Sequence, residues 1–187
     1  KVYSSGKLQH IVNRDIAWIA AWGTTEEFLQ KFREDDEMQY FYDRGLIYYA
    51  LSNPDMGSCY EISSFLLSRC NKEKKNCILE KKTRDFDGPY HMLFRRKNYD
   101  VLQTAELCEQ LFEAGADPNQ AGEKNVLPIE LMMALPFTEE ELHPLYDFWM
   151  KLSAVDLKLH TFDGKQPIDF AKKYKRKKLA TWIKNQL

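Results

Sequence analysis

The histidines that lie near acidic residues are the first candidates for chemistry in this sequence. His143 and His160 could pair with Asp147 or Asp163, which would supply the groups of a hydrolytic site. Such a site needs a convergent geometry that the spacing does not indicate, and a solvated surface histidine is the more common arrangement. The sequence also has no Gly-rich phosphate loop, no His-Glu-x-x-His and no Gly-x-Ser-x-Gly pattern. We therefore predict no catalytic residue, and an enzyme with a site in a groove is the least favoured class of function.

The cysteines do not follow a metal-binding pattern. Six residues separate Cys70 from Cys77 and no CxxC pair occurs, whereas structural zinc sites use closer pairs. We expect Cys59, Cys70, Cys77 and Cys108 to be free or buried thiols, and we predict no metal and no cofactor. The first residues contain no apolar signal segment, and no apolar run approaches the ~20 residues that cross a membrane. A cytoplasmic protein without membrane contact is the expectation.

Size and charge limit the classes of function further. The chain has 187 residues, 44% of them hydrophobic, which is enough for one buried domain over residues 1–187. Its 27 basic and 28 acidic residues leave a net charge of -1, which argues against a general binder of nucleic acid or anionic membranes. The run from Lys172 to Lys178 nevertheless gathers six basic residues around Tyr174. This run is interpreted as a solvated end of the domain, and the alternative is a patch for nucleic acid or an acidic partner.

Three prolines recur at equal spacing in the second half of the chain. Pro89, Pro128 and Pro167 are 39 residues apart, and each precedes an apolar stretch. Proline suits the first turn of a helix because its missing N–H would have no partner there. Each start is followed by a second amphipathic segment, so the spacing indicates an internal repeat of two helices. The second helices are predicted over residues 105–114, 142–152 and 177–185.

The segment from Leu111 to Asn119 (LFEAGADPN) is the most specific part of the repeat. It places a helix end, a capping glycine at Gly115 and an Asp-Pro-Asn turn at fixed offsets. This segment resembles the Leu-Leu-x-x-Gly-Ala-Asp-x-Asn pattern of the ankyrin repeat, and the three prolines match the family's Thr-Pro-Leu-His helix start in part. The resemblance implies an all-α, ankyrin-type solenoid of stacked helix-turn-helix repeats. Another helical-hairpin solenoid is the alternative, because 39 residues exceed the roughly 33 of an ankyrin repeat.

The resemblance also implies a structural role for the residue two positions after each proline. His91 occupies the ankyrin histidine position, where the family's imidazole joins the helix and turn backbones. Glu130 and Asp169 take its place in the next two repeats. We expect their carboxylates to accept turn N–H groups instead, because an unpaired buried carboxylate is costly.

The first part of the chain fits the repeat less closely. We interpret residues 34–37 as an acidic linker and residues 71–76 as an extended loop. Thr24 or Thr25 precedes two glutamates, which is typical of a capped helix start. Helices are predicted here over residues 15–21, 24–32, 44–51 and 62–69. The domain then holds four to five repeats, degenerate over about residues 10–80 and clearer over about 84–187, with atypical ends as caps.

An ankyrin-type fold implies a binding surface. Partners of the family usually meet the turn tips and the exposed side of the first helices, on the concave face, and binding hot spots favour aromatic and Arg side chains. The expected function is a non-enzymatic, monomeric module that binds a partner protein. A narrower form of this hypothesis is a small bacterial regulatory or immunity-type protein. The alternative is a nucleic-acid-associated protein that uses the C-terminal basic run. The repeat offsets select as partner-binding residues Trp22, Phe41, Tyr42, Arg84, Asp85, Asp87, Arg95, Arg96, Glu123, Lys124, Phe162, Asp163, Lys173 and Tyr174.

Overall fold

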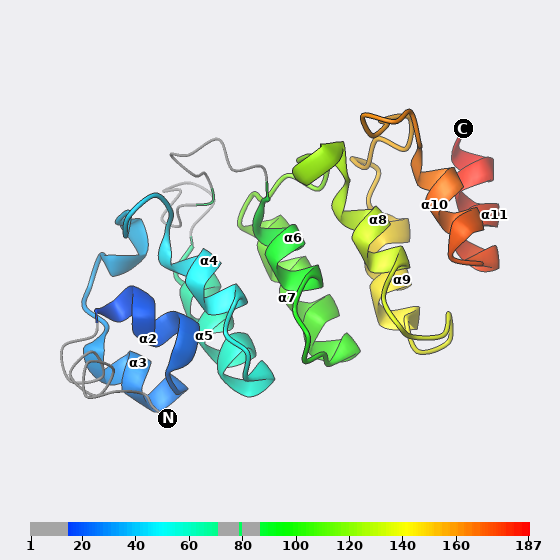
Figure 1. The fold of residues 1–187 in the computed structure, drawn as a ribbon. Coiled ribbons are helices and arrows are strands. Elements are labelled where there is room, and N and C mark those ends of the chain that lie inside the picture. Colours follow the sequence, from blue (N-terminus) through cyan, green and yellow to red (C-terminus); the bar gives the residue numbers. More distant parts are fainter. Residues whose placement is uncertain (1–14, 71–78, 80–86) are drawn as a thin grey trace, which may run out of the picture.

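The helices of the chain lie in one row that runs from the N-terminal to the C-terminal end (Figure 1). The computed structural model describes residues 15–70, 79 and 87–187. Within these ranges the regular structure is helical, apart from an isolated bridge between Phe41 and Arg44. The all-α class predicted from the sequence is therefore confirmed for the described residues.

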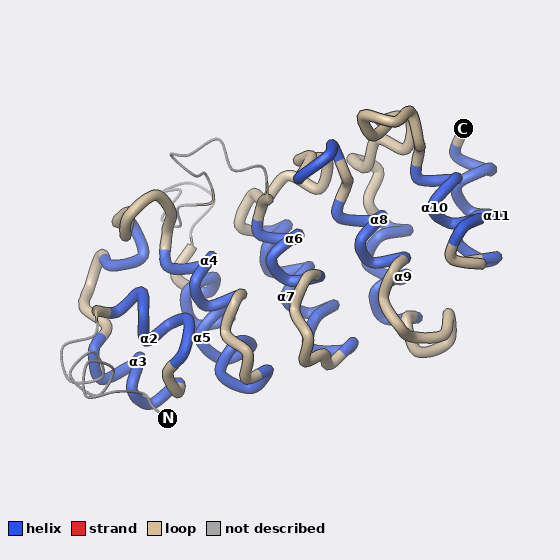
Figure 2. Tube along the Cα trace, in the orientation of Figure 1, coloured by secondary structure: helices blue, strands red, loops and turns tan. Residues whose placement is uncertain are grey.

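Each repeat contributes a first and a second helix, and helices of the same kind stack on each other. In the first layer α2 contacts α4, α4 contacts α6, α6 contacts α8 and α8 contacts α10, while α5 and α7 and then α7 and α9 stack in the second layer (Figure 2). The first helices are α2 (Ile16–Trp22), α4 (Leu46–Leu51), α6 (Pro89–Phe94), α8 (Pro128–Met133) and α10 (Pro167–Lys173). The second helices are α3 (Thr25–Lys31), α5 (Met56–Ser68), α7 (Val101–Glu113), α9 (His143–Lys151) and α11 (Lys177–Gln186). Two 3-10 turns, η1 (Asp36–Met38) and η2 (Glu123–Asn125), lie in the connections.

Local capping explains where several helices begin. The predicted capped start lies at Thr24, which forms a capping box with Glu27: each side chain accepts the other residue's backbone N–H. Helices α5 and α7 begin earlier than the predicted residues 62 and 105, because Asp55 and Asp100 are their N-caps. The Asp55 carboxylate accepts the Ser58 N–H at 2.7 Å. The apolar pattern placed these helices correctly, and the missed aspartate caps set their starts.

Gly115 ends α7 in the way that the sequence predicts. Its φ is +100°, in the left-handed region that glycine enters without the steric cost of a Cβ. The Ala116 N–H then donates to the Leu111 carbonyl at 2.9 Å, which satisfies one of the free carbonyls at the helix end. The predicted left-handed cap is confirmed.

Apolar side chains from both layers form a continuous core along the row. Trp149 of α9 is fully buried, and its indole ring centroid lies 5.6 Å from the ring of Tyr90 in α6. Phe28 packs in the same way at the N-terminal end, where its ring meets Phe65 of α5 edge-on at 6.1 Å. Each helix pair thus buries its apolar stripe against the neighbouring pair. Among the described residues, no helix has both the length and the apolar character needed to cross a bilayer.

Polar side chains also tie successive repeats together. The Asn53 amide donates to the carbonyls of Ala20 and Gly23, both at 3.0 Å, at the end of α2. One repeat later, the Arg96 guanidinium donates to the carbonyls of Leu51 at 3.3 Å and Asn53 at 2.8 Å, at the end of α4. The last carbonyls of a helix have no partner within it, so these side chains satisfy them from the next repeat.

Arg176 makes the corresponding tie near the C-terminal end of the row. It is 8% exposed, and its guanidinium donates to the carbonyls of Met133 at 2.9 Å, Leu135 at 2.6 Å and Phe137 at 2.5 Å. Arg176 belongs to the basic run from Lys172 to Lys178, but its charge lies inside the fold. A buried guanidinium with three charge-assisted hydrogen bonds is a structural group.

Residues 34–37 lie in the connection between α3 and α4, and within them Glu37 is buried and forms an ion pair with Arg69 at 2.8 Å. One expectation about the cysteines is wrong. Cys59 and Cys108 are free and buried as expected, whereas Cys70 is disulfide-bonded. The predicted loop at residues 71–76, together with Cys77, lies outside the described residues.

Candidate functional site

Four of the five first helices leave an apolar side chain half-exposed at the same place, whereas the corresponding Ile19 of α2 is buried. In α4, α6 and α8 every side chain is buried except Tyr49, Met92 and Leu131. Phe170 takes this position in α10, and all four side chains pack partly against the core. Because these helices stack side by side, the four side chains form a row along the first layer, which we call the apolar ladder.

Three residues after each ladder member stands an exposed residue, at or directly after the end of the helix and on the same side of it. It carries a polar or small side chain, so the apolar ladder has a more hydrophilic border. In the third repeat, for example, the Arg95 Nε lies 2.9 Å from the Asp87 carboxylate. We define the first-helix face as the ladder plus this border, namely Tyr49, Met92, Leu131 and Phe170 with Ser52, Arg95, Ala134 and Lys173.

Sequence reasoning missed the apolar ladder but could have found it. Its members stand one position after His91, Glu130 and Asp169, so three of them recur at the same 39-residue interval as the prolines. The offsets chosen from the resemblance instead favoured charged residues and turn tips. Of those selected residues, Arg95 and Lys173 belong to the first-helix face.

The charge of Arg96 is already engaged by backbone carbonyls. Its guanidinium is held by the carbonyls of the preceding repeat, and its Nε donates to the Asn98 carbonyl at 2.6 Å. A group with three backbone acceptors has little left to offer a ligand. We therefore leave Arg96 out of the proposed surface.

The selected residues of the first two repeats lie at the N-terminal end of the row. Trp22 and Tyr42 are 64% and 80% exposed. The Tyr42 hydroxyl donates to the Asp15 carboxylate at 3.2 Å, and the charge of that carboxylate raises the pKa of Tyr42. Phe41 is half-buried against the core, and its carbonyl accepts the Tyr49 hydroxyl at 2.9 Å. Trp22 and Tyr42 are thus accessible to a partner, while Phe41 is mainly a packing residue.

The turns of the middle repeats carry charges that are already paired in part. Asp87 accepts the Glu123 backbone N–H at 3.3 Å as well as the Arg95 guanidinium. Glu123 and Lys124 are exposed in η2, where Lys124 has a φ of +58°. Arg84 and Asp85 lie outside the described residues.

At the last turn an aromatic ring projects into solvent beside an organised carboxylate. Phe162 is 77% exposed. Asp163 accepts the Thr161 hydroxyl and lies 3.1 Å from the Lys165 Nζ. The hydrogen bond from Thr161, followed by the one from Lys165, lowers the pKa of Asp163. Tyr174, near the end of α10, is half-buried, and the Lys173 Nζ lies 5.1 Å from its ring centroid.

The three residues that stand two positions after the repeated prolines differ in their surroundings. His91 is fully buried; its Nδ1 accepts the Gly88 N–H at 3.1 Å, and its Nε2 lies 2.8 Å from the Val126 carbonyl, so it joins its own turn to the next one. Asp169 accepts the Gln166 N–H at 3.0 Å, in agreement with the expectation.

Glu130 contradicts that expectation. It is 1% exposed, and neither carboxylate oxygen has a hydrogen-bond partner in the described part of the chain. Burial raises the pKa of Glu130 to about 8, and the nearby Asp163 charge adds to the effect. The adjacent Leu127 backbone acts weakly in the opposite direction. At neutral pH the folded chain therefore holds Glu130 mainly in its protonated form.

The residues considered for hydrolysis do not converge. His143 pairs with Asp147 at 3.4 Å within α9, but both side chains are more than half exposed, at 65% and 52%. His160 contacts the Thr161 carbonyl at 3.2 Å in a separate turn. Across residues 15–70, 79 and 87–187, no group of three or more His, Cys, Asp or Glu side chains is placed to hold a metal ion.

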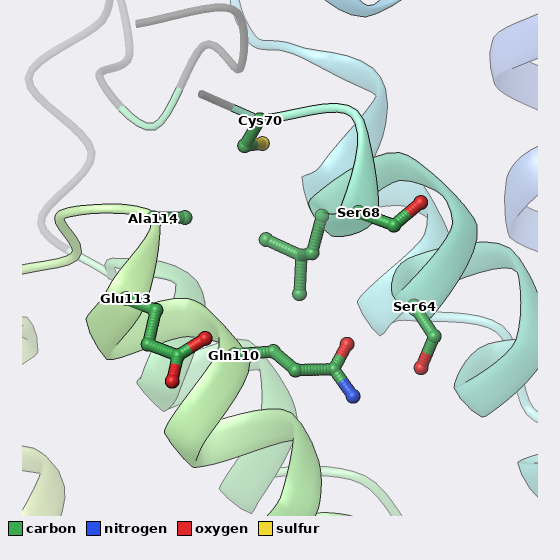
Figure 3. A pocket seen from close by; sticks show the side chains of 7 residues that line it. Ser64, Ser68, Cys70, Gln110, Glu113 and Ala114 are labelled. Atoms are coloured by element: carbon green, nitrogen blue, oxygen red, sulfur yellow. The ribbon is translucent and has the colours of Figure 1, made fainter. Parts of the chain in front are cut away.

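A cavity of about 430 Å³ lies on the second layer, between α5 and α7. Figure 3 shows that its walls are mostly polar or small side chains, with Glu113 and Gln110 on one side and Ser64 and Ser68 on the other. It has neither the apolar lining nor the convergent titratable groups of a small-molecule site. Its lining residues are Ser64, Leu67, Ser68, Cys70, Gln110, Glu113 and Ala114.

Comparison with known proteins identifies a similar fold. The crystal structure of a functionally unknown protein from Leptotrichia buccalis C-1013-b matches with a TM-score of 0.75 and 21% identity, over 94% of each chain. At this level of identity the likeness extends to the fold alone. No protein family and no curated protein matches the sequence.

Proposed function

We propose that this chain is an ankyrin-type repeat protein that binds a partner protein on its first-helix face. The ankyrin-type assignment is supported by the segment Leu111–Asn119, by the left-handed Gly115 and by the stacked helix layers. His91 supports it as well, because it joins the turns of two successive repeats.

The observation that carries the binding proposal is the apolar ladder. A half-exposed apolar side chain in one repeat is ordinary, since apolar atoms cover much of any protein surface. Four such side chains at the same position of successive first helices form a continuous strip instead. Axes of packed helices are roughly 8–10 Å apart, so the strip spans several contact points for one extended partner.

The architecture also keeps the cost of binding low. The ladder lies on helices whose other side chains are buried in α4, α6 and α8, so little order has to be gained when a partner binds. Polar neighbours such as Ser52 and Arg95 border the strip, which matches the apolar centre and polar rim of protein interfaces.

Site-specific photo-crosslinking tests this proposal in the native cell extract. A photoreactive phenylalanine analogue replaces Leu131 on the ladder, and in a matched control it replaces Glu109, which is exposed on α7 in the second layer. The proposal predicts one defined protein crosslinked from position 131, absent from position 109, and displaced by an excess of the unlabelled chain.

Two results would contradict it. Equal crosslinking from both positions would place binding away from the first-helix face or indicate non-specific contact. The absence of any crosslinked protein from position 131, and from Met92 replaced in the same way, would remove the ladder as a binding surface.

A further inference from the structure

Four exposed lysines lie at the end of α10, the last of the first helices, and directly after it. Lys172 and Lys173 belong to the last turn of α10, Lys175 lies in the connection to α11, and Lys177 begins α11. We call these four residues the lysine cluster. No ion pair joins any of them to a carboxylate in the described ranges.

The carboxylates that the fold brings near this end are already engaged. Glu140 pairs with the Nζ of Lys178, and this hydrogen bond lowers the pKa of Glu140. Glu139 accepts the Tyr146 hydroxyl at 3.1 Å and the Lys178 backbone N–H at 3.1 Å. The chain as a whole has a net charge of -1, so the positive charge of the cluster is a local feature.

The lysine cluster is continuous with the apolar ladder. Lys173 stands three residues after Phe170 on the same side of α10, and its Nζ lies over the ring of Tyr174 at 5.1 Å. Arg176, in contrast, turns its charge into the fold. The first-helix face therefore has an apolar strip that ends in cations.

We propose that the segment which binds the first-helix face is an acidic polypeptide stretch. Its apolar side chains would lie along Met92, Leu131 and Phe170, and its carboxylates would meet the lysine cluster. This inference rests on the proposed function and adds the chemistry of the partner.

A polypeptide fits these observations better than a nucleic acid. A phosphate backbone has no apolar side chains for the ladder, and nucleic-acid binders need several basic contacts along the strand. The exposed carboxylates of Asp163 and Asp169, which flank the start of α10, would repel a polyphosphate chain. An acidic polypeptide, in contrast, can confine its carboxylates to the part that meets the lysine cluster and place apolar side chains along the apolar ladder.

Selection from a displayed library of random 16-residue peptides tests the proposal. Three forms of the full chain serve as bait: the wild type, a variant with Lys172, Lys173, Lys175 and Lys177 all changed to Glu, and a charge-matched control. In the control the exposed lysines Lys97, Lys151, Lys158 and Lys184 are changed to Glu instead. Circular dichroism verifies that all three forms are folded.

The wild type and the control are expected to enrich peptides that combine Asp or Glu with apolar residues. The cluster variant should lose this acidic bias, and the best acidic peptide should bind it at least tenfold more weakly, since four exposed charge pairs each contribute a modest amount. Raising the salt concentration should weaken the wild-type complex because it screens such pairs.

The other outcomes separate the two proposals. Enriched peptides that are apolar but carry no acidic bias would overturn the acidic partner and leave the binding function intact. No enrichment by any form, together with no crosslinking from position 131, would overturn both. Binding of a dT20 oligonucleotide that is lost in the cluster variant but kept in the control would assign the cluster to nucleic acid and overturn the inference.

Discussion

Replacing Glu130 by Gln should stabilise the protein at neutral pH. Glu130 is almost completely buried without a hydrogen-bond partner, and burial raises the pKa of its carboxyl from 4.5 to about 8. In the unfolded chain this carboxyl ionises freely in water. Folding at pH 7 must therefore return a proton to the side chain, which costs free energy.

The size of this cost follows from the two pKa values. Where the carboxyl is ionised in the unfolded chain but protonated in the folded one, the free energy of unfolding falls by about 1.4 kcal/mol per pH unit. Between the unfolded pKa of 4.5 and pH 7 this loss amounts to about 3 kcal/mol. The penalty is absent below pH 4.5, grows between pH 4.5 and about 8, and is constant above that. The Gln amide is a neutral substitute, but it also lacks partners, which reduces the gain by about 1 kcal/mol.

Urea unfolding followed by tryptophan fluorescence at several pH values measures this effect. We expect Glu130→Gln to raise the free energy of unfolding by about 2 kcal/mol at pH 7 and to lower it by about 1 kcal/mol at pH 4, where only the cost of the unpaired amide remains. Asp169→Asn is the matched control, because Asp169 is exposed and accepts the Gln166 N–H; its change should stay within about 0.5 kcal/mol. If the free energies of unfolding of the wild type and Glu130→Gln change in parallel from pH 4 to pH 8, the claim that folding keeps a buried, neutral carboxyl at Glu130 is refuted.

Three further substitutions test the fold by equilibrium unfolding. Gly115→Val should cost more than about 1 kcal/mol, because its φ of +100° is strained for a β-branched residue, and a neutral result would contradict the left-handed cap. Arg176→Met should cost on the order of 3 kcal/mol, because three carbonyls lose a charged donor; a loss below about 1 kcal/mol would mean that water replaces it. His91→Leu should cost about 2 kcal/mol through the unpaired Gly88 N–H and Val126 carbonyl, and unchanged stability would show that this tie is dispensable.

The helices and their ends were largely predictable because their causes are local. Pro89, Pro128 and Pro167 each occupy the first turn of a first helix, as the sequence indicates. The Thr24 capping box and the Gly115 cap depend on backbone groups three to five residues away. Where local signals were overlooked, as with the Asp100 cap of α7, the error was only in the position of a helix end.

The candidate surface was predictable only in part. Exposure along a helix follows from which neighbour packs against it, and Met92 and Leu131 are half-exposed because the first layer has no helix on its outer side within the described residues. Apolar residues at these positions look like core residues in a sequence. The resemblance therefore directed attention to charged residues such as Arg96, whose side chain serves the preceding repeat.

The sequence by itself determined the all-helical class and the cap at Gly115, because each depends on residues within one or two turns of each other, and it showed the 39-residue spacing of the helix-starting prolines directly. Tertiary structure decided the roles of Arg176, Glu37 and Glu130, whose surroundings come from other repeats. Arg176 reaches carbonyls about 40 residues earlier, and Glu37 meets Arg69 across two helices. A side chain's charge, pKa and availability depend on such distant neighbours, since burial and pairing set the free energy of an ionisable group.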